Sequence, residues 1–136
     1  MLAKKYPQHK FFFNPEFLVE KTAINNYINP LRQIVGYASA EDLDDASNIL
    51  ELLPKAPYSM VCPADEAEMT KLVGNDFLAL KVVFANQIYD YCQKKGVDYE
   101  LVVNMVKQDD RIGKSHWQIF FDGYRGYDGH CFPKDM

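Results

Sequence analysis

The amino-terminal part of the chain carries short apolar runs separated by turn-forming residues. Phe11 to Phe13 is such a run and ends at Asn14 and Pro15, and Gln33 to Tyr37 and Tyr58 to Cys62 are two more. Short apolar runs with turn signals at their ends are typical of buried β-strands. We therefore predict three short strands in this part of the chain.

A helix is predicted between the second and third strands. Ser39 precedes it, and its hydroxyl can accept hydrogen bonds from the free N–H groups of the first turn. Pro54 ends it, because proline cannot continue a helix. Its apolar positions share one face and are Leu43, Ala46, Leu50 and Leu53. The order strand, helix, strand indicates a parallel α/β sheet, whose open edge needs a partner.

One long helical pattern runs from Ala64 to Lys95 without an internal proline. Two lysines at its end suit the negative end of a helix, and Gly96 supplies the stop. At ~1.5 Å per residue the helix would be roughly 45–50 Å long. This is longer than a small body needs, so we expect part of it to pack on another domain or subunit. The apolar positions that repeat along it are Met69, Leu72, Leu80, Phe84, Ile88 and Tyr91.

Asp98 is predicted to cap a further helix, and Asp109 to Gly113 breaks it. The expected buried stripe of this helix is Leu101, Val102, Met105 and Val106. From Asp122 onward three glycines and a proline indicate a shaped loop. The predicted fold is an α/β fragment with short parallel strands and a helix, followed by a mainly α-helical region with one long helix.

Composition limits the classes of partner. The chain has 136 residues, 48% of them hydrophobic, and a formal net charge of -4. A nucleic-acid surface normally needs a basic face, so we expect no nucleic-acid partner. The longest apolar stretch, Phe77 to Ile88, is interrupted by Lys81 and Asn86 and is too short for a membrane span.

Cysteine and histidine positions point to a cytoplasmic protein without a bound metal. The three cysteines are an odd number spread along the chain, which does not indicate a disulfide framework. His9, His116 and His130 have no metal-like spacing with the cysteines. We therefore predict no metal site and a reducing, cytoplasmic location.

Cys131 is the candidate nucleophile. It stands two positions before Pro133, a residue favoured at the first position of a helix. A thiol at a helix start feels the positive end of the dipole, which favours the reactive thiolate. Asp135 follows four residues later and would lie on the same side. The alternative is that Cys131 is a small buried residue, as free cysteines often are.

Two polar pairs are candidate site residues. Lys71 and Asn75 stand four residues apart on the long helix and can stabilise an oxyanion with a charge and an amide donor. Glu16 and Glu20 are also four apart and follow the first strand, where a carboxylate can act as a general base. Taken alone, each pair has a simpler alternative that is the more common case, which is two solvated surface residues. Arg111 can form an ion pair or reach a phosphate or sugar.

Four segments taken together carry a resemblance. They are NPEFLVEKTAI (Asn14 to Ile24), EMTKLVGNDFLALKVVFANQI (Glu68 to Ile88), DDRIG (Asp109 to Gly113) and GYDGHCFPKD (Gly126 to Asp135). In this order they resemble the signature segments of the UDP-glucose/GDP-mannose dehydrogenase family. The resemblance covers nearly the whole chain, and its cysteine block and Lys-x-x-x-Asn helix are its most specific parts.

The resemblance implies a domain division. Residues 1–62 would be the end of an NAD-binding α/β domain. Residues 63–136 would be the central helical dimerisation domain with the catalytic-cysteine loop, forming a homodimer through the long helix.

The resemblance also implies a chemistry in which NAD oxidises the primary alcohol of a UDP-hexose in two steps to a carboxylate. UDP-glucose is the first choice of substrate. Cys131 would trap the intermediate aldehyde as a thiohemiacetal, which the second oxidation turns into a thioester. Glu20 would act as the base in hydrolysis, with Glu16 as a supporting acid. Asp135 would position water. Stabilisation of charge on the reacting oxygen would fall to Lys71 and Asn75.

The resemblance implies that five residues bind the substrate: Phe17, Leu18, Arg111, Gly126 and Gly129. Arg111 would reach the substrate across the dimer interface. Two positions depart from the family pattern. Lys21 and Asp128 stand where the family usually has glycine.

The chain has no G-x-G-x-x-G turn for NAD among its seven glycines. We expect it to be an excised or truncated middle region that is inactive alone. A different class of function is a non-catalytic dimerisation or assembly module derived from this family. A stand-alone thiol enzyme is a third possibility, in which only His130 adjoins Cys131.

Overall fold

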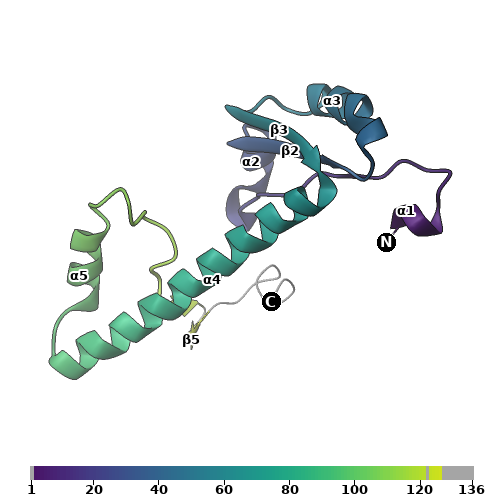
Figure 1. Cartoon of the computed structure of the whole chain (residues 1–136). Helices are drawn as coiled ribbons and strands as arrows, with labels where there is room; N and C mark the ends of the chain where they lie inside the picture. Colours follow the sequence, from purple (N-terminus) through teal and green to yellow (C-terminus); the bar gives the residue numbers. More distant parts are fainter. Residues whose placement is uncertain (1, 122, 127–136) are drawn as a thin grey trace. The chain divides into compact units, whose positions relative to one another are not determined.

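A computed structural model describes residues 2–121 and 123–126. The chain divides into two compact units, Met1–Leu72 and Val73–Met136. Each unit is described by itself (Figure 1). Helix α4 (Ala64–Lys95) has the bounds that the sequence predicts and runs through the division.

Unit 1 is built on a three-stranded sheet in the order β1-β2-β3. The strands are β1 (Phe12–Phe13), β2 (Arg32–Tyr37) and β3 (Tyr58–Pro63), so all three predicted strands form. β2 and β3 are parallel, as predicted. β1 is antiparallel to β2. The prediction of parallel strands came from the two strands that flank α3 and made no statement on β1, because so short an apolar run contains no information on strand direction.

Helix α3 (Leu43–Leu52) packs against β2 and β3, and Val35 and Ala46 are fully buried in this contact region (Figure 1). The predicted Ser39 cap is not formed. A 3-10 turn, η2 (Ala40–Asp42), separates Ser39 from α3, and the Ser39 side chain makes no capping hydrogen bond. The helix start is instead tied to the chain before β1, since Lys10 pairs with Asp42 at 3.2 Å and with Asp45.

Gly36 lets the first turn of α4 approach β2. A Cβ atom at this position would lie 2.8 Å from the Cα of Ala64 and 3.0 Å from the Cβ of Ala67. Real Cβ atoms do not approach backbone this closely, so only glycine fits without a shift. The close approach fixes the start of α4 against the sheet.

The remaining elements are short. In unit 1 they are α1 (Leu2–Lys5), η1 (Glu20–Thr22) and α2 (Ala23–Ile28). In unit 2 they are α5 (Tyr99–Val106), β4 (Phe120–Phe121) and β5 (Tyr124–Arg125), the last two forming an antiparallel hairpin. None of the helices in the described part of the chain is long and apolar enough to cross a membrane.

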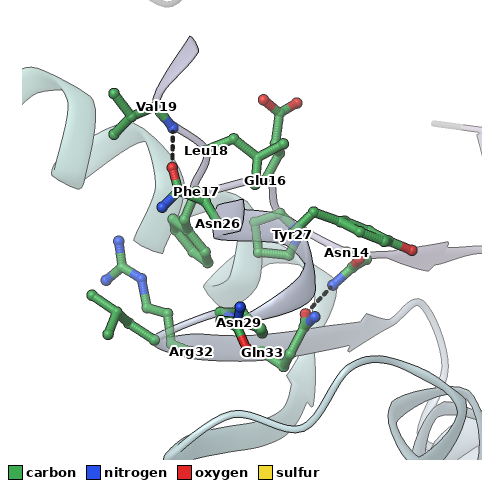
Figure 2. A pocket seen from close by; sticks show the side chains of 13 residues that line it. Asn14, Glu16, Phe17, Leu18, Val19, Asn26, Tyr27, Asn29, Arg32 and Gln33 are labelled. Carbon is green, nitrogen blue, oxygen red and sulfur yellow. Dashed lines mark hydrogen bonds between the residues drawn. The ribbon is translucent and has the colours of Figure 1, made fainter. Parts of the chain in front are cut away.

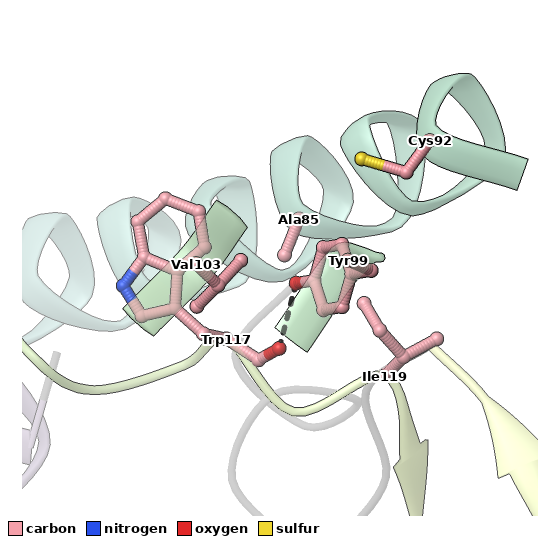
Figure 3. Close-up of a cluster of buried hydrophobic side chains, with 6 residues drawn as sticks. All are labelled: Ala85, Cys92, Tyr99, Val103, Trp117 and Ile119. Carbon is pink, nitrogen blue, oxygen red and sulfur yellow. Dashed lines mark hydrogen bonds between the residues drawn. The ribbon is translucent and has the colours of Figure 1, made fainter. Parts of the chain in front are cut away.

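Unit 2 has its own core, which lies between α4, α5 and the segment that leads to β4 (Figure 3). The Tyr99 hydroxyl donates a hydrogen bond to the backbone carbonyl of Trp117 at 2.8 Å. Burial raises the pKa of Tyr99 to about 12. The buried residues of this core are Ala85, Cys92, Tyr99, Val103, Trp117 and Ile119.

Helix α5 begins as predicted, but its buried face differs. The Asp98 side chain accepts hydrogen bonds from the backbone N–H groups of Glu100 and Leu101, which confirms the cap. Val103 is buried, whereas Leu101 and Met105 are 60% and 61% exposed. The prediction placed these two in the buried stripe and was wrong. Tyr99 and Val103, which were not in the predicted stripe, are the buried residues of α5 instead.

In unit 2, α4 has two apolar faces. Its buried positions carry small side chains and include Ala79, Val82, Ala85 and Cys92. Larger side chains spaced four, three, four and seven residues apart remain between 49% and 62% exposed, and we name them the α4 stripe: Val73, Phe77, Leu80, Phe84 and Tyr91. The large residues of the predicted pattern that lie in this stripe are therefore not part of the core of unit 2.

Candidate functional site

An open cavity of about 610 Å³ lies in unit 1 between the segment after β1, helix α2 and the start of β2 (Figure 2). The segment 14–19 forms one wall. It carries Glu16, Phe17 and Leu18, three of the predicted site residues. The other wall comes from 26–33, which the sequence analysis did not connect with a site.

Side-chain hydrogen bonds hold both ends of segment 14–19. Asn14 Nδ2 donates to the carbonyl of Ile34 at 2.7 Å, and Asn26 Oδ1 accepts from the backbone N–H of Val19 at 3.0 Å. Asn26 Oδ1 also accepts from the Thr22 hydroxyl at 2.8 Å. Since each end is tied to a regular element, the cavity wall has a defined path although it is a loop.

The cavity carries one cation on its wall. The guanidinium carbon of Arg32 lies 3.6 Å from the centroid of the Phe17 ring (Figure 2). A stacked guanidinium keeps its N–H donors available at the edge of its plane, where carboxylate or phosphate groups bind. The cavity wall can therefore take an anionic group beside an aromatic surface.

Lys71 connects α4 with the cavity wall. Its Nζ donates to the backbone carbonyl of Glu16 at 2.7 Å, across 55 residues of sequence. The structure thus brings together two predicted site segments within unit 1. Asn75 lies one turn further along α4, half-buried and in unit 2. Glu20 is placed by its backbone at the start of η1, and its carboxylate lies outside the described part of the structure.

Arg111 belongs to unit 2 and forms the ion pair that the sequence allowed. Its Nη2 lies 2.6 Å from Asp109 Oδ2, and its Nε donates to Oδ1 at 2.9 Å. These hydrogen bonds lower the pKa of Asp109. The Arg111 side chain is 89% exposed, so its guanidinium is oriented by Asp109 and still accessible from solvent.

The turn that carries Arg111 is fixed by side chains from elsewhere in unit 2. Lys81 Nζ donates to the carbonyl of Ile112 at 3.2 Å, and Trp117 Nε1 donates to the carbonyl of Gly113 at 3.1 Å. Gly113 has a φ of 75°, which favours glycine. Sequence reasoning missed Lys81 and Trp117, because their contacts are set by the fold.

The predicted thiol loop lies mostly outside the described residues. This applies to Cys131, Asp135 and Gly129, whereas Gly126 is described and has a φ of 103°. Cys92 is buried in the core of unit 2. Burial and the nearby Glu66 raise the pKa of Cys62, which disfavours its thiolate form.

The structure adds no metal centre to this picture. Within residues 2–121 and 123–126 no group of three or more His, Cys, Asp or Glu side chains could hold a metal ion.

Comparison with known proteins decides the family. Residues 65–136 match the model of the UDP-glucose/GDP-mannose dehydrogenase family, central domain. The chain belongs to this family. The resemblance stated on sequence segments is thereby confirmed, and the mixed α/β and long-helix fold agrees with it.

Relatives in the dehydrogenase family cover the chain almost entirely. A UDP-glucose 6-dehydrogenase from Bacillus subtilis is 39% identical over 124 residues, which are 90% of this chain and 26% of that protein. The UDP-glucose 6-dehydrogenase of Campylobacter jejuni is 32% identical over 135 residues, 98% of this chain and 33% of that protein. The chain thus spans about a quarter to a third of the length of these relatives.

A solved structure gives the same result for the fold. The UDP-glucose dehydrogenase of the hyperthermophilic archaeon Pyrobaculum islandicum superposes with a TM-score of 0.77 at 34% identity. The match covers 93% of this chain and 28% of that one.

NAD is the cofactor that the family implies, and the turn between β2 and α3 does not have the glycines of a dinucleotide-binding turn. A dinucleotide needs a glycine-rich turn between a strand and a helix start. The turn between β2 and α3 contains Ala38 and Ser39, and Asp42 stands at the helix start. Asp42 and its partner Lys10 already form an ion pair at this helix start, at 3.2 Å. An NAD site in a protein that contains this chain would therefore need residues other than those of this turn.

Proposed function

We propose that this chain supplies the substrate-handling and thiol-bearing segments of an NAD-dependent nucleotide-sugar 6-dehydrogenase. The substrate we propose is a UDP-hexose, with UDP-glucose first because the curated relatives carry that name. Besides family membership, one contact supports the proposal: Lys71 of α4 donates to the carbonyl of Glu16 in the cavity wall. NAD, when bound to the complete enzyme, would accept the two hydrides that the oxidation of an alcohol to an acid releases.

In this proposal the chain's polar residues handle the oxygen of the sugar. Lys71 donates to the Glu16 carbonyl at 2.7 Å, so its ammonium group lies beside the middle of segment 14–19. A preset cation stabilises negative charge on a reacting oxygen without reorganisation. Asn75 would add an amide donor. Arg32 and Phe17 would meet an anionic part of the substrate in the cavity.

Cys131 and the carboxylates carry the covalent steps. The thiolate adds to the aldehyde carbon, and the oxygen takes up a proton to give a thiohemiacetal. Loss of a hydride and a proton gives the thioester. Water then attacks the thioester carbon with Glu20 as base and Glu16 in support, and the carbon–sulfur bond breaks to release acid and thiol. Asp135 would hold that water.

The α4 stripe supports the proposed homodimer. Its members recur with the spacing of a helix-packing seam, and each is at least 49% exposed in unit 2. Exposed contiguous apolar surface of this kind marks interaction sites. The same stripe would serve the second candidate function, a non-catalytic assembly module. We further propose that Arg111 reaches the substrate of the partner subunit.

Activity of the complete enzyme tests the catalytic function. Cys131→Ser should abolish NADH formation from UDP-glucose and NAD, and Lys71→Met should lower kcat by roughly 100- to 1000-fold, as loss of an oxyanion-stabilising donor does. The isolated chain should form no NADH. Undiminished turnover by Cys131→Ala would overturn the catalytic role and favour the assembly module.

Oligomeric state tests the dimer. Leu80→Glu places a charge in the middle of the α4 stripe and should convert the dimer into monomers in sedimentation velocity at micromolar concentration. Gln93→Glu, at an exposed position on a different side of the same helix, is the matched control and should leave the dimer intact. A dimer that survives Leu80→Glu would rule out this seam.

A further inference from the structure

We propose that Arg125 is a positioning residue that fixes the β4–β5 hairpin on α4 and thereby sets where the thiol loop begins. The inference rests on the catalytic role proposed for Cys131. Arg125 is the last residue of β5, and Gly126 follows it with a φ of 103°. Cys131 stands six positions after Arg125 in the sequence.

All three nitrogens of the Arg125 guanidinium are engaged by one side of α4. Nε donates to Asn86 Oδ1 at 3.0 Å, and Nη2 donates to the Asn86 carbonyl at 3.2 Å. Nη1 donates to Asp90 Oδ1 at 2.8 Å. Asn86 and Asp90 are one helical turn apart, so the plane of the guanidinium is defined by acceptors at separate points along α4.

Aromatic rings hold the same hairpin from its other strand. The guanidinium carbon of Arg125 lies 5.2 Å from the centroid of the Tyr89 ring. Phe120, which pairs with Arg125 across the hairpin, makes an edge-on contact with Tyr89 at 5.6 Å. Tyr89 in turn contacts the core residue Tyr99 at 5.4 Å. Tyr89 therefore connects the hairpin with the core of unit 2 by direct ring contacts.

This arrangement suits positioning better than stabilisation. The Arg125 and Asp90 side chains are 39% and 62% exposed, and ion pairs of that kind contribute little to folding. A fork of N–H donors on fixed acceptors does restrict orientation, however, and a displacement of about 1 Å at a reacting group can lower a rate by about 100-fold. Lysine cannot replace it, because an ammonium group cannot meet the separate acceptors in one plane.

The test uses the complete enzyme with UDP-glucose and NAD. Arg125→Lys keeps the charge and loses the fork, while Arg125→Met loses both. We expect both to lower kcat by roughly 10- to 100-fold with little change in the KM for UDP-glucose. Asp90→Asn, a milder change, should lower kcat less. Lys95→Gln removes one positive charge from the end of α4 and is the matched control, with kcat unchanged.

Thiol reactivity supplies a readout that a purely structural role would not move. Iodoacetamide labelling of Cys131 is followed by peptide mass spectrometry between pH 5 and 9, with Cys62 and Cys92 as internal references. We expect the labelling midpoint of the unchanged enzyme to lie below the value of about 8.5 of a free cysteine. In Arg125→Lys it should move toward that value, while labelling of buried Cys92 stays slow and shows that unit 2 remains folded.

Two results separate the possible failures. If Arg125→Lys keeps both the kcat and the labelling midpoint of the unchanged enzyme, Arg125 acts by charge or not at all, and the positioning role is overturned. If Cys131→Ser keeps its turnover, the proposed catalytic function fails, and the positioning role falls with it whatever the Arg125 variants do. Rapid labelling of Cys92 in an Arg125 variant would mean that unit 2 has lost its fold. The test then uses Asp90→Asn, and an unchanged kcat and an unchanged Cys131 labelling midpoint in that variant would overturn the positioning role of Arg125.

Discussion

The two units of the chain bury their interiors in different ways. In unit 2 the interior contains large aromatic side chains, with Trp117 6% and Tyr99 3% exposed. In unit 1 the fully buried positions are small or β-branched, Val35, Ala46 and Ala67 among them. Unit 2 is therefore held by side-chain volume, whereas unit 1 is held by the close approach of backbone at Gly36.

This difference bears on the candidate site. The proposed substrate cavity lies in unit 1, in a loop that asparagine side chains and Lys71 hold by hydrogen bonds. The exposed α4 stripe and the Arg125 fork lie in unit 2, on a helix whose opposite face the aromatic core fixes. A rigid core suits residues that must keep an orientation, and a loop held by hydrogen bonds suits the contact with a ligand.

Removal of the largest core side chain should give the largest effect. Trp117→Ala removes an indole that is buried, donates to the Gly113 carbonyl and contacts Phe84 at 6.2 Å. We expect a loss of about 3–5 kcal/mol in the free energy of unfolding of unit 2. Urea unfolding followed by circular dichroism measures it. Tyr124→Ala is the control. The Tyr124 side chain is already 76% exposed in the folded protein, so its removal should change the urea midpoint little.

A methyl group at the close approach should damage unit 1 without removing any contact. Gly36→Ala forces the first turn of α4 away from β2, because the new Cβ would meet the Cα of Ala64 at 2.8 Å. We expect a loss of about 1–3 kcal/mol. The comparison is Gly96→Ala, where no atom lies within 4 Å and only the φ of 68° opposes a side chain. That variant should lose about 1 kcal/mol. Equal or reversed losses would contradict the steric explanation.

Loss of the α5 cap should weaken unit 2 moderately. Asp98→Ala leaves the N–H groups of Glu100 and Leu101 without their side-chain acceptor. The expected loss in the free energy of unfolding is about 1 kcal/mol. Asp98→Asn keeps an acceptor and should restore most of it. The measurement is the denaturant midpoint of the two variants. Equal losses of stability in Asp98→Asn and Asp98→Ala would contradict the capping role of Asp98.

Acid should weaken unit 2 slightly through His116. Burial and the neighbouring charge of Lys81 lower the pKa of His116 from its ordinary 6.5. The folded unit therefore favours neutral histidine. Its contribution to stability is fully present above pH ~6.5 and is lost as the pH falls through the lowered pKa. The lowered pKa values of Asp90 and Asp109 act in the same direction only at still lower pH.

The measurement is the urea midpoint, followed by Trp117 fluorescence at pH 7.5 and pH 5. His116→Asn is the control, since asparagine tolerates the φ of 66° at this position and does not titrate. A variant with the pH dependence of the unchanged protein would exclude His116 as the cause.

Several features could be predicted from the sequence because local signals decide them. The bounds of α4 follow from the absence of proline between Pro63 and Gly96 and from Gly96 itself, and the cap of α5 follows from Asp98. The strands β2 and β3 follow from apolar runs between turns. Glu16, Phe17, Leu18 and Lys71 were predicted as site residues through the family motifs. Of these, only Lys71 lies within the residues 65–136 that match the family model.

Tertiary structure decided the features that depend on distant residues. The sequence could not tell that Tyr99 rather than Leu101 is buried, because both lie at apolar positions of α5 and only the surface opposite chooses between them. The direction of β1, the Lys71 contact with the Glu16 carbonyl and the Arg125 fork likewise join segments far apart in the chain. Local sequence sets backbone preferences and helix ends, whereas burial and side-chain pairing are set by what the fold places nearby.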